Sequence, residues 1–381
     1  MTKTNIEWSG DVWNFLRGCS RVSEGCRNCY AESVALRFSG EGLPYEGLAR
    51  RAPNGEARWT GDVRVVREKL GDPLRWRKTR LVFVNSMSDL FHEKVPFHVL
   101  AAAWGVMAAA PQHTFQILTK RPERAAAFFA WLDERAAQAQ REMFPHDSLS
   151  WCRHHVCRAA AFREGVDRVV TGGDARSDRW PLGNVHLGVS VEDQATLDER
   201  VRLLRELPAW VRWISYEPAL GPVTVAPHLP LPVLSAAPHP PPIETVQTLA
   251  AHRRLWAARE GRIGTGYIDW VVVGGESGHR ARPFALTWAA RVVAECAEAC
   301  VPVFVKQLGA WPYADWPGTP ESLLNLRFKV EGVKKRPWLD LKKKKGNDPS
   351  EWPELLRVRQ SPAPVANVGE LVQALQGAVA A

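Results

Sequence analysis

The sequence predicts an α/β protein built as a partial or closed (β/α) barrel of the TIM type, and three observations support this. Short apolar runs rich in β-branched residues recur along the chain, as is typical of parallel strands covered on both faces. Segments with helical periodicity separate these runs, and alternating strands and helices predict right-handed βαβ units. Polar residues follow each run at its C-terminal end, the edge at which (β/α) barrels build their active sites.

Six strands are predicted in chain order, with a weaker one near Asn5–Trp8. The six runs are Leu81–Asn85, Thr114–Leu118, Val185–Ser190, Arg212–Tyr216, Asp269–Val273 and Val303–Lys306. Helical patterns lie between them, at Val99–Ala109, Pro122–Met143, Gln194–Leu207 and Leu286–Cys300. Because the carboxyl ends of barrel strands meet on one face, we expect the polar residues after these strands to form a shared site.

The domain organisation predicted is one barrel over residues 1–330 with two insertions, at 148–182 and 222–262. The first insertion is rich in cysteine and histidine, and the second opens with a proline-rich stretch that excludes regular structure. Residues 331–381 are predicted to be a C-terminal basic loop and extension. The basic run Lys342–Lys345 is typical of a solvated loop, and phosphate contact is the alternative.

Charge and hydrophobicity indicate the class of partner. The chain carries 50 Lys and Arg against 41 Asp and Glu, a net charge of +9, which favours an anionic partner such as a nucleotide or nucleic acid. No apolar run approaches the ~20 residues of a membrane span. The beginning of the sequence also lacks the apolar stretch of a signal peptide. We therefore expect a cytoplasmic protein with no membrane partner.

Three of the seven cysteines, Cys19, Cys26 and Cys29, lie within eleven residues. In a reducing compartment such thiols are free or bind metal. They could hold three irons of a [4Fe–4S] cluster and leave the fourth iron open for substrate. With a distant histidine or cysteine they could instead form a structural zinc site. Buried free thiols are the third reading, and the spacing alone does not choose between iron and zinc.

Two other cysteine clusters and a paired glycine give weaker signals. Cys152, His154, His155 and Cys157 have residue types that suit zinc, although an ordinary insertion would look the same. Cys296 and Cys300 lie one turn apart on an amphipathic helix, which predicts core packing. Gly274 and Gly275 precede Glu276, so a ligand could approach the backbone there, or the glycines could serve a tight turn. The sequence has no P-loop, G-x-S-x-G or H-E-x-x-H motif.

Several segments together resemble a known family. They include TNIEWSGDVWNFLRGCSRVSEGCRNCYAE, VFVNSMSDLFHEKVP, FQILTKRPER, RWISYEPALGPV, DWVVVGGESGHRARP and VPVFVKQLGAW. In this order they resemble the phage gene product 37 / gene product 68 family, which carries a three-Cys motif. The resemblance covers most of the chain outside the two insertions. It implies a barrel like that of radical S-adenosylmethionine enzymes, in which Cys19, Cys26 and Cys29 hold a [4Fe–4S] cluster. In that superfamily, reduction of S-adenosylmethionine gives a 5′-deoxyadenosyl radical.

The chain departs from the superfamily pattern in three ways. The gap between the first two cysteines is six residues instead of three. An aromatic residue, Tyr30, follows the last cysteine instead of preceding it. The GGE motif comes near the sixth or seventh strand instead of after the second. The resemblance therefore assigns the amino group of S-adenosylmethionine to Ser86, Ser88 or Asp89, and leaves Glu276 for ribose or substrate. The remaining candidates for cofactor binding are Ser190, Glu192, Gly274 and Gly275.

Two functions remain open from the sequence. The first is a radical S-adenosylmethionine enzyme that acts on a nucleotide, nucleic acid or other anionic substrate, including phage DNA modification or repair. Its catalytic candidates are Glu217, Glu276 and Lys306, and its phosphate-binding candidates are Lys120, Arg121, Arg280 and Arg282. It would need an external reductant, and the resemblance implies a dedicated partner protein. The second is a zinc-stabilised nucleic-acid-binding protein without catalysis, favoured by the basic run and by tryptophans expected to be exposed.

Overall fold

The computed structural model describes residues 7–171, 180–230, 266–278, 280–314, 328–329, 338–339, 341–343 and 345–362. Its principal sheet has seven parallel strands that neighbour one another in chain order. In sheet order these are β1 (Asp11–Trp13), β6 (Leu81–Val84), β7 (Thr114–Thr119), β8 (Val185–Val191), β9 (Val211–Tyr216), β10 (Trp270–Gly274) and β12 (Val303–Gln307). The order starts at β1 and ends at β12, so over the described ranges the sheet is open. This confirms a mixed α/β fold of the partial (β/α) barrel kind.

The first strand lies later in the chain than predicted. Glu7 and Trp8 form a turn, and β1 begins at Asp11, where it pairs in parallel with Val82–Val84 of β6. The indole of Trp13 is fully buried, and its Nε1 donates to the carbonyl oxygen of Lys69 at 2.8 Å. Burial of this large side chain fixes the register of β1, a tertiary effect that the short apolar pattern near Trp8 did not reveal. The rest of the strand predicted there, Asn5 and Ile6, lies outside the described residues.

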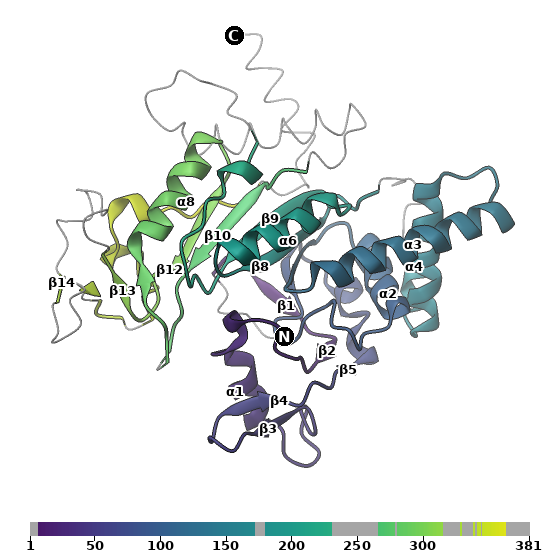
Figure 1. Cartoon of the computed structure of the whole chain (residues 1–381). Coiled ribbons are helices and arrows are strands. Elements are labelled where there is room, and N and C mark those ends of the chain that lie inside the picture. The colour runs from purple at the N-terminus through teal and green to yellow at the C-terminus, as the bar shows by residue number, and fades with distance from the viewer. Residues whose placement is uncertain are drawn as a thin grey trace, which may run out of the picture. The chain divides into compact units, whose positions relative to one another are not determined.

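The chain divides into two compact units. The first comprises the described residues of Met1–Leu187 together with Leu207–Val211. Its helices α2 (Phe97–Ala108), α3 (Pro122–Glu142) and α4 (Leu149–Arg163) pack side by side (Figure 1). The backbones of α2 and α4 approach closely, because a Cβ on Gly105 would lie 2.5 Å from the carbonyl oxygen of Cys157. Helix α4 and the short α5 (Arg168–Thr171) fall within the predicted insertion 148–182.

A small substructure in the first unit carries the three-cysteine segment. The antiparallel hairpin of β3 (Ala49–Arg51) and β4 (Ala57–Trp59) packs against α1 (Tyr30–Arg37). Strand β2 (Leu16–Arg17), which precedes α1 in the sequence, pairs antiparallel with β5 (Arg64–Val65), which follows β4. The 3₁₀ helices of this unit are η1 (Glu24–Cys26), η2 (Arg67–Lys69) and η3 (Asp72–Arg75). None of these short elements was predicted from the sequence, because two- and three-residue strands show no apolar alternation.

The second unit comprises Gly188–Glu206 and the described residues of Arg212–Ala363. Strands β9 and β10 pair in parallel, β10 pairs in parallel with β12, and every residue of β9 and β10 is buried. Helices α6 (Gln194–Glu206) and α8 (Leu286–Glu298) belong to this unit, with η4 (Ala226–His228), η5 (Pro349–Glu351) and η6 (Glu354–Leu356). A four-stranded sheet has the order β11 (Phe284–Ala285), β13 (Pro312–Tyr313), β15 (Trp338–Leu339) and β14 (Phe328–Lys329).

The chain beyond the basic run packs onto the second unit. The backbone N–H of Val305 in β12 donates to the carbonyl oxygen of Val358, and that of Gln360 donates to Val303, both at 2.9 Å. Trp352 and Leu356 are fully buried. Residues 345–362 thus pack against β12, and Trp352 and Leu356 carry the segment into the core of this unit. Most of the second predicted insertion, residues 231–265, lies outside the described residues.

The described tryptophans other than Trp311 are buried or half-buried, which corrects the expectation that many would be exposed. Those with at most 9% exposure are Trp8, Trp13, Trp59, Trp104, Trp213, Trp270 and Trp352. Among the tryptophans that the structure describes, Trp311, at 46%, is the exposed one. The support that exposed tryptophans gave to single-strand binding is therefore weaker for this part of the chain. Over the same residues, no helix is both long enough and apolar enough to cross a bilayer.

Candidate functional site

The three predicted metal ligands lie on the connection between β2 and α1. The connection turns back at Gly18, whose φ of 94° favours glycine and whose missing Cβ would lie 2.1 Å from the carbonyl oxygen of Asp62. Cys19 follows this turn directly, and Cys26 ends the 3₁₀ helix η1. Cys29 occupies the N-cap position of α1 in extended geometry. One glycine and one helix start therefore set the path of the whole segment.

Two of the three thiols are held in an apolar environment. Cys19 and Cys29 pack against a cluster of buried residues: Ala31, Ala35, Ala49, Trp59 and Met87. The pKa of the Cys19 thiol is raised to about 12, chiefly by burial; the negative charge of Asp89 contributes to the rise, and Arg121 opposes it. Burial also raises the pKa of Cys29, and the Cys26 sulfur adds to this effect. Both groups are therefore neutral thiols near pH 7, and a bound metal would have to displace their protons.

An ion pair fastens the stretch between Cys19 and Cys26 to helix α1. The Nε of Arg21 donates to Oε1 of Glu32 at 2.9 Å, and its Nη2 donates to the carbonyl oxygen of Arg27 at 2.7 Å. Glu32 is 2% exposed, and the same Oε1 accepts the backbone N–H of Trp59 at 3.3 Å. Glu32 also lies 3.9 Å from Nη1 of Arg58, so two arginines and a backbone N–H balance its buried charge, and the Arg21 contact stabilises the loop conformation.

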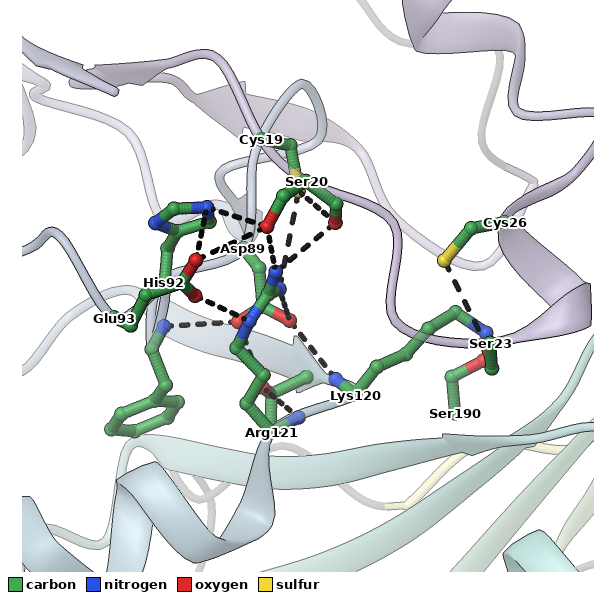
Figure 2. Close-up of polar contacts among 12 residues, drawn as sticks. Cys19, Ser20, Ser23, Cys26, Asp89, His92, Glu93, Lys120, Arg121 and Ser190 are labelled. Carbon is green, nitrogen blue, oxygen red and sulfur yellow. Dashed lines mark hydrogen bonds and ion pairs between the residues drawn. The ribbon is translucent and has the colours of Figure 1, made fainter. Parts of the chain in front are cut away.

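Asp89, predicted to bind the amino group of the cofactor, is 7% exposed and accepts from several protein groups (Figure 2). Its Oδ1 accepts from Oγ1 of Thr119 at 2.7 Å and from the backbone N–H of Phe91 at 2.9 Å. Its Oδ2 accepts the backbone N–H of Lys120 at 3.0 Å and lies 3.2 Å from Nη1 of Arg121. A carboxylate has about four acceptor positions. An external amino group would therefore have to displace one of these donors.

Ser86 and Ser88, the other candidates for the amino group, connect the loop after β6 to the segment before the cysteines. The side-chain Nδ2 of Asn14 donates to Oγ of Ser86 at 3.1 Å, and the backbone N–H of Ser86 donates to Oδ1 of Asn14 at 2.8 Å. Oγ of Ser88 donates to the carbonyl oxygen of Leu16 at 3.3 Å. Asn85, with a φ of 59°, makes the turn between them and β6. The structure thus brings Ser86, Ser88 and Asp89 into the same unit as the three cysteines.

A serine, a histidine and a glutamate that the sequence analysis missed adjoin Cys19 (Figure 2). Oγ of Ser20 lies 2.9 Å from Nε2 of His92 and 3.3 Å from Oε1 of Glu93. Nδ1 of His92 accepts the backbone N–H of Lys94 at 3.2 Å, which assigns the ring proton to Nε2. His92 therefore donates to Ser20 and does not take its proton, so this trio is not a nucleophile with its base. The signal in the sequence was the pair His92-Glu93 soon after a strand end.

The second unit brings together two of the three catalytic candidates. Nζ of Lys306 lies 2.7 Å from Oε1 and 3.0 Å from Oε2 of Glu217, and both side chains are less than one fifth exposed. Gln307, which the sequence analysis did not single out, donates from Nε2 to Oε1 of Glu217 at 3.2 Å and to the carbonyl oxygen of Gly275 at 2.8 Å. The ammonium thus holds its proton directly against the carboxylate.

The paired glycines serve close packing around this ion pair. A Cβ on Gly274 would lie 3.1 Å from Cδ of Glu217, and one on Gly275 would lie 2.6 Å from the carbonyl oxygen of Leu308. Protein atoms therefore fill the space that the sequence left open for a ligand. The third catalytic candidate, Glu276, accepts from the backbone N–H and from Nε of Arg282, each at 2.9 Å. Arg282, a phosphate candidate, is therefore paired with Glu276.

The two cofactor candidates at the C-terminal end of β8, Ser190 and Glu192, also make internal contacts in the second unit. Oγ of Ser190 donates to the carbonyl oxygen of Glu217 at 3.0 Å. Oε1 of Glu192 lies 3.2 Å from Nη1 of Arg200, and this ion pair is less than one tenth exposed. The same Nη1 donates to the carbonyl oxygen of Ser190 at 2.7 Å. These contacts tie the end of β8 to α6.

The second cysteine cluster belongs to helix α4 rather than to a loop. Cys152 and Cys157 are at most 1% exposed, and burial raises both pKa values. The ring of His155 stacks on Trp151, and the ring of His154 meets Trp180 edge-on. Across the described residues no three His, Cys, Asp or Glu side chains form a group arranged for one ion. For the three-cysteine segment, the donor chemistry fits an iron–sulfur cluster or zinc, because three thiols share one constrained connection.

Comparison with known proteins gives a family. No curated protein and no solved structure matches the chain. Residues 3–356 match the family described as "Protein of unknown function (DUF5131)". This match includes the three-cysteine segment, every strand of the principal sheet and the Glu217–Lys306 pair. Since the match extends over most of the sequence, the chain belongs to the DUF5131 family.

Proposed function

We propose that the protein is a radical S-adenosylmethionine-type [4Fe–4S] enzyme that acts on an anionic substrate. The observation that carries the proposal is the segment between β2 and α1, which presents three thiols beside a parallel sheet of the partial barrel kind. Cys19 and Cys29 pack against one apolar cluster. A negative charge on Cys29 raises the pKa of Cys19, and one on Cys26 raises the pKa of Cys29. Three thiols on one short connection are the donor set of a cluster that leaves one iron open.

The chain's own residues would do three things in this enzyme. Cys19, Cys26 and Cys29 would hold the cluster, and Asp89 and Arg121 would keep the first of them in position. Lys306 would hold a proton at Nζ against Glu217 and so supply a paired acid and base. When bound, the cluster would supply the electron that cleaves S-adenosylmethionine to a 5′-deoxyadenosyl radical. An external reductant must provide that electron.

The substrate class follows from charge. The net charge of +9 favours an anion, and a nucleotide or nucleic acid fits it best. Among the four phosphate candidates, Arg121 and Arg282 are paired with buried carboxylates. Arg280 is exposed and Lys120 is half-buried, so these two are the better placed to meet a phosphate. A dedicated partner protein, implied by the phage-family resemblance, belongs to the same proposal.

The test is release of 5′-deoxyadenosine. The protein is purified and reconstituted with iron and sulfide without oxygen, reduced with dithionite in the presence of S-adenosylmethionine, and assayed by mass spectrometry. We expect release from the wild type, none from Cys29→Ser, and wild-type release from Cys300→Ser, which removes a thiol on the other unit. Binding of zinc with no iron in the wild type would overturn the proposal and favour the zinc-stabilised nucleic-acid-binding protein.

A further inference from the structure

Arg121 is 4% exposed, and its guanidinium meets as many acceptor atoms as it has N–H groups (Figure 2). Nε donates to Oε2 of Glu93 at 3.2 Å. Nη1 lies 3.2 Å from Oδ2 of Asp89 and 4.0 Å from Sγ of Cys19. Nη2 donates to the carbonyl oxygen and to Oγ of Ser20, at 3.0 and 2.8 Å. These acceptors account for all five donors, so Arg121 serves the protein itself and not a substrate phosphate.

These contacts join three separate segments of the first unit. Cys19 and Ser20 come from the three-cysteine connection, Asp89 and Glu93 follow β6, and Arg121 is the N-cap residue of α3. His92 also binds Ser20, because its Nε2 lies 2.9 Å from Oγ of Ser20. A single buried guanidinium therefore fixes where the first cysteine stands relative to the sheet.

The charges around Cys19 oppose one another. Nη1 of Arg121 contacts both Oδ2 of Asp89 and Sγ of Cys19, so a positive charge adjoins the sulfur and offsets the nearby carboxylate. Without the guanidinium, Asp89 and Glu93 would both lose the ion pair that Arg121 makes with them, and Cys19 would lose its contact with a positive charge. In iron–sulfur proteins, a hydrogen bond and a positive charge at a ligand sulfur favour the reduced, more negative cluster.

We infer that Arg121 is a positioning residue for Cys19, which holds Sγ in place and raises the reduction potential of a cluster bound through it. The inference rests on the proposed function, because it concerns the same cluster. Its two parts are separable: the positioning of Cys19 exists in the metal-free protein, and the effect on the potential exists only in the loaded one.

The experiment compares the wild type with Arg121→Gln, Arg121→Lys and a control, Arg124→Gln. Arg124 lies on the same helix, contacts the Phe97 ring and donates to the carbonyl oxygens of Glu93 and Val95, so the control removes the same charge three residues away. Amide hydrogen exchange of residues 16–24 is measured in metal-free protein. The midpoint potential and the electron paramagnetic resonance spectrum are measured after reconstitution.

In metal-free Arg121→Gln, we expect exchange over residues 16–24 to be about tenfold faster, as for the loss of one or two charged hydrogen bonds. We expect the midpoint potential to move to a more negative value, with a smaller shift in Arg121→Lys and none in Arg124→Gln. If Arg121→Gln does not fold, the exchange and the midpoint potential of Arg121→Lys test the inference instead. This variant keeps the charge and loses the five-donor geometry. Unchanged exchange or an unchanged potential would overturn the inference. A wild type that takes up no iron would refute the proposed function, while the exchange result would still decide whether Arg121 positions Cys19.

Discussion

Gly18 lies directly against the backbone of Asp62, so that a Cβ at position 18 would be 2.1 Å from the Asp62 carbonyl oxygen. This contact places the residue before Cys19, and φ at Gly18 is 94°. Gly61 provides a matched control, since its φ is 87° and nothing lies within 4 Å of a Cβ there. The comparison separates the cost of positive φ, which the two sites share, from the cost of the clash.

We predict that Gly18→Ala destabilises the protein by at least ~2 kcal/mol more than Gly61→Ala, because backbone must move to admit the methyl group. Urea unfolding of the two variants measures the difference. We also expect Gly18→Ala to lose metal content, since the shift moves Cys19. Equal stability of the two variants would show that the Cys19 turn does not depend on this contact.

Asp89 gives a second prediction, for a buried charge. Its carboxylate lies 3.2 Å from Nη1 of Arg121, and both side chains are less than one tenth exposed. We predict that Asp89→Asn lowers the free energy of unfolding by about 3 kcal/mol, because it leaves Arg121 with less counter-charge in the interior. The control is Asp62→Asn, which breaks an exposed pair with Lys94 and should change stability within error. A similar small effect in Asp89→Asn would contradict a structural role for this carboxylate.

The pair of Glu217 and Lys306 supports a third prediction, by a double-mutant cycle. Glu217→Gln leaves the ammonium without this counter-charge, and Lys306→Met leaves the carboxylate with the Gln307 amide in place of an ion pair. The double variant removes both charges. We predict a coupling energy of ~1–3 kcal/mol, measured as unfolding free energies of the four proteins. Additive effects would mean that the two groups do not act as a unit.

His113 gives a prediction about pH. The imidazole is fully buried, and burial lowers its pKa below 6.5, partly offset by the hydrogen bond to the carbonyl oxygen of Pro73. The unfolded chain therefore binds more protons than the folded one between the folded pKa and 6.5. Stability contributed by the neutral ring is full above pH 6.5 and is lost as pH falls through the folded pKa.

We accordingly expect the urea midpoint to fall as pH is lowered from 7.5, and to fall less steeply in His113→Gln. The free energy of unfolding of the wild type should depend on pH more steeply than that of the variant, by at most ~1.4 kcal/mol per pH unit for one proton. Unfolding curves at a series of pH values, on both proteins, measure it. Identical slopes in the wild type and the variant would contradict the prediction.

The sheet was largely predictable from the sequence because its strands are buried on both faces. β6, β7, β8, β9, β10 and β12 each start and end within one residue of the predicted runs. The helices α3 and α6 were predicted to within one residue for the same kind of reason, a clear apolar periodicity. The sequence did not reveal β1, β2–β5 or the small sheet of the second unit. Their positions depend on tertiary contacts, such as the burial of Trp13 and the close packing of Gly275.

The candidate site was predictable in its members but not in its contacts. Strand ends and clustered cysteines indicated Cys19, Asp89 and Arg121. Arg121 contacts Ser20 and Cys19 across more than 100 residues of chain, and no local pattern contains such contacts. Its ion pairs with Asp89 and Glu93 also join separate elements. Gln307 could have been found as the amide that follows Lys306 at a strand end.

The central claim is that the three cysteines hold an iron–sulfur cluster, and metal content tests it most directly. Iron, sulfide and zinc are measured together with the absorbance spectrum in anaerobically prepared wild type, Cys26→Ser and the control Cys300→Ser. We expect about four irons and four sulfides per chain with a broad band near ~400 nm in the wild type and control, lost in Cys26→Ser. One zinc and no iron in the wild type, or full iron content in Cys26→Ser, would contradict the account.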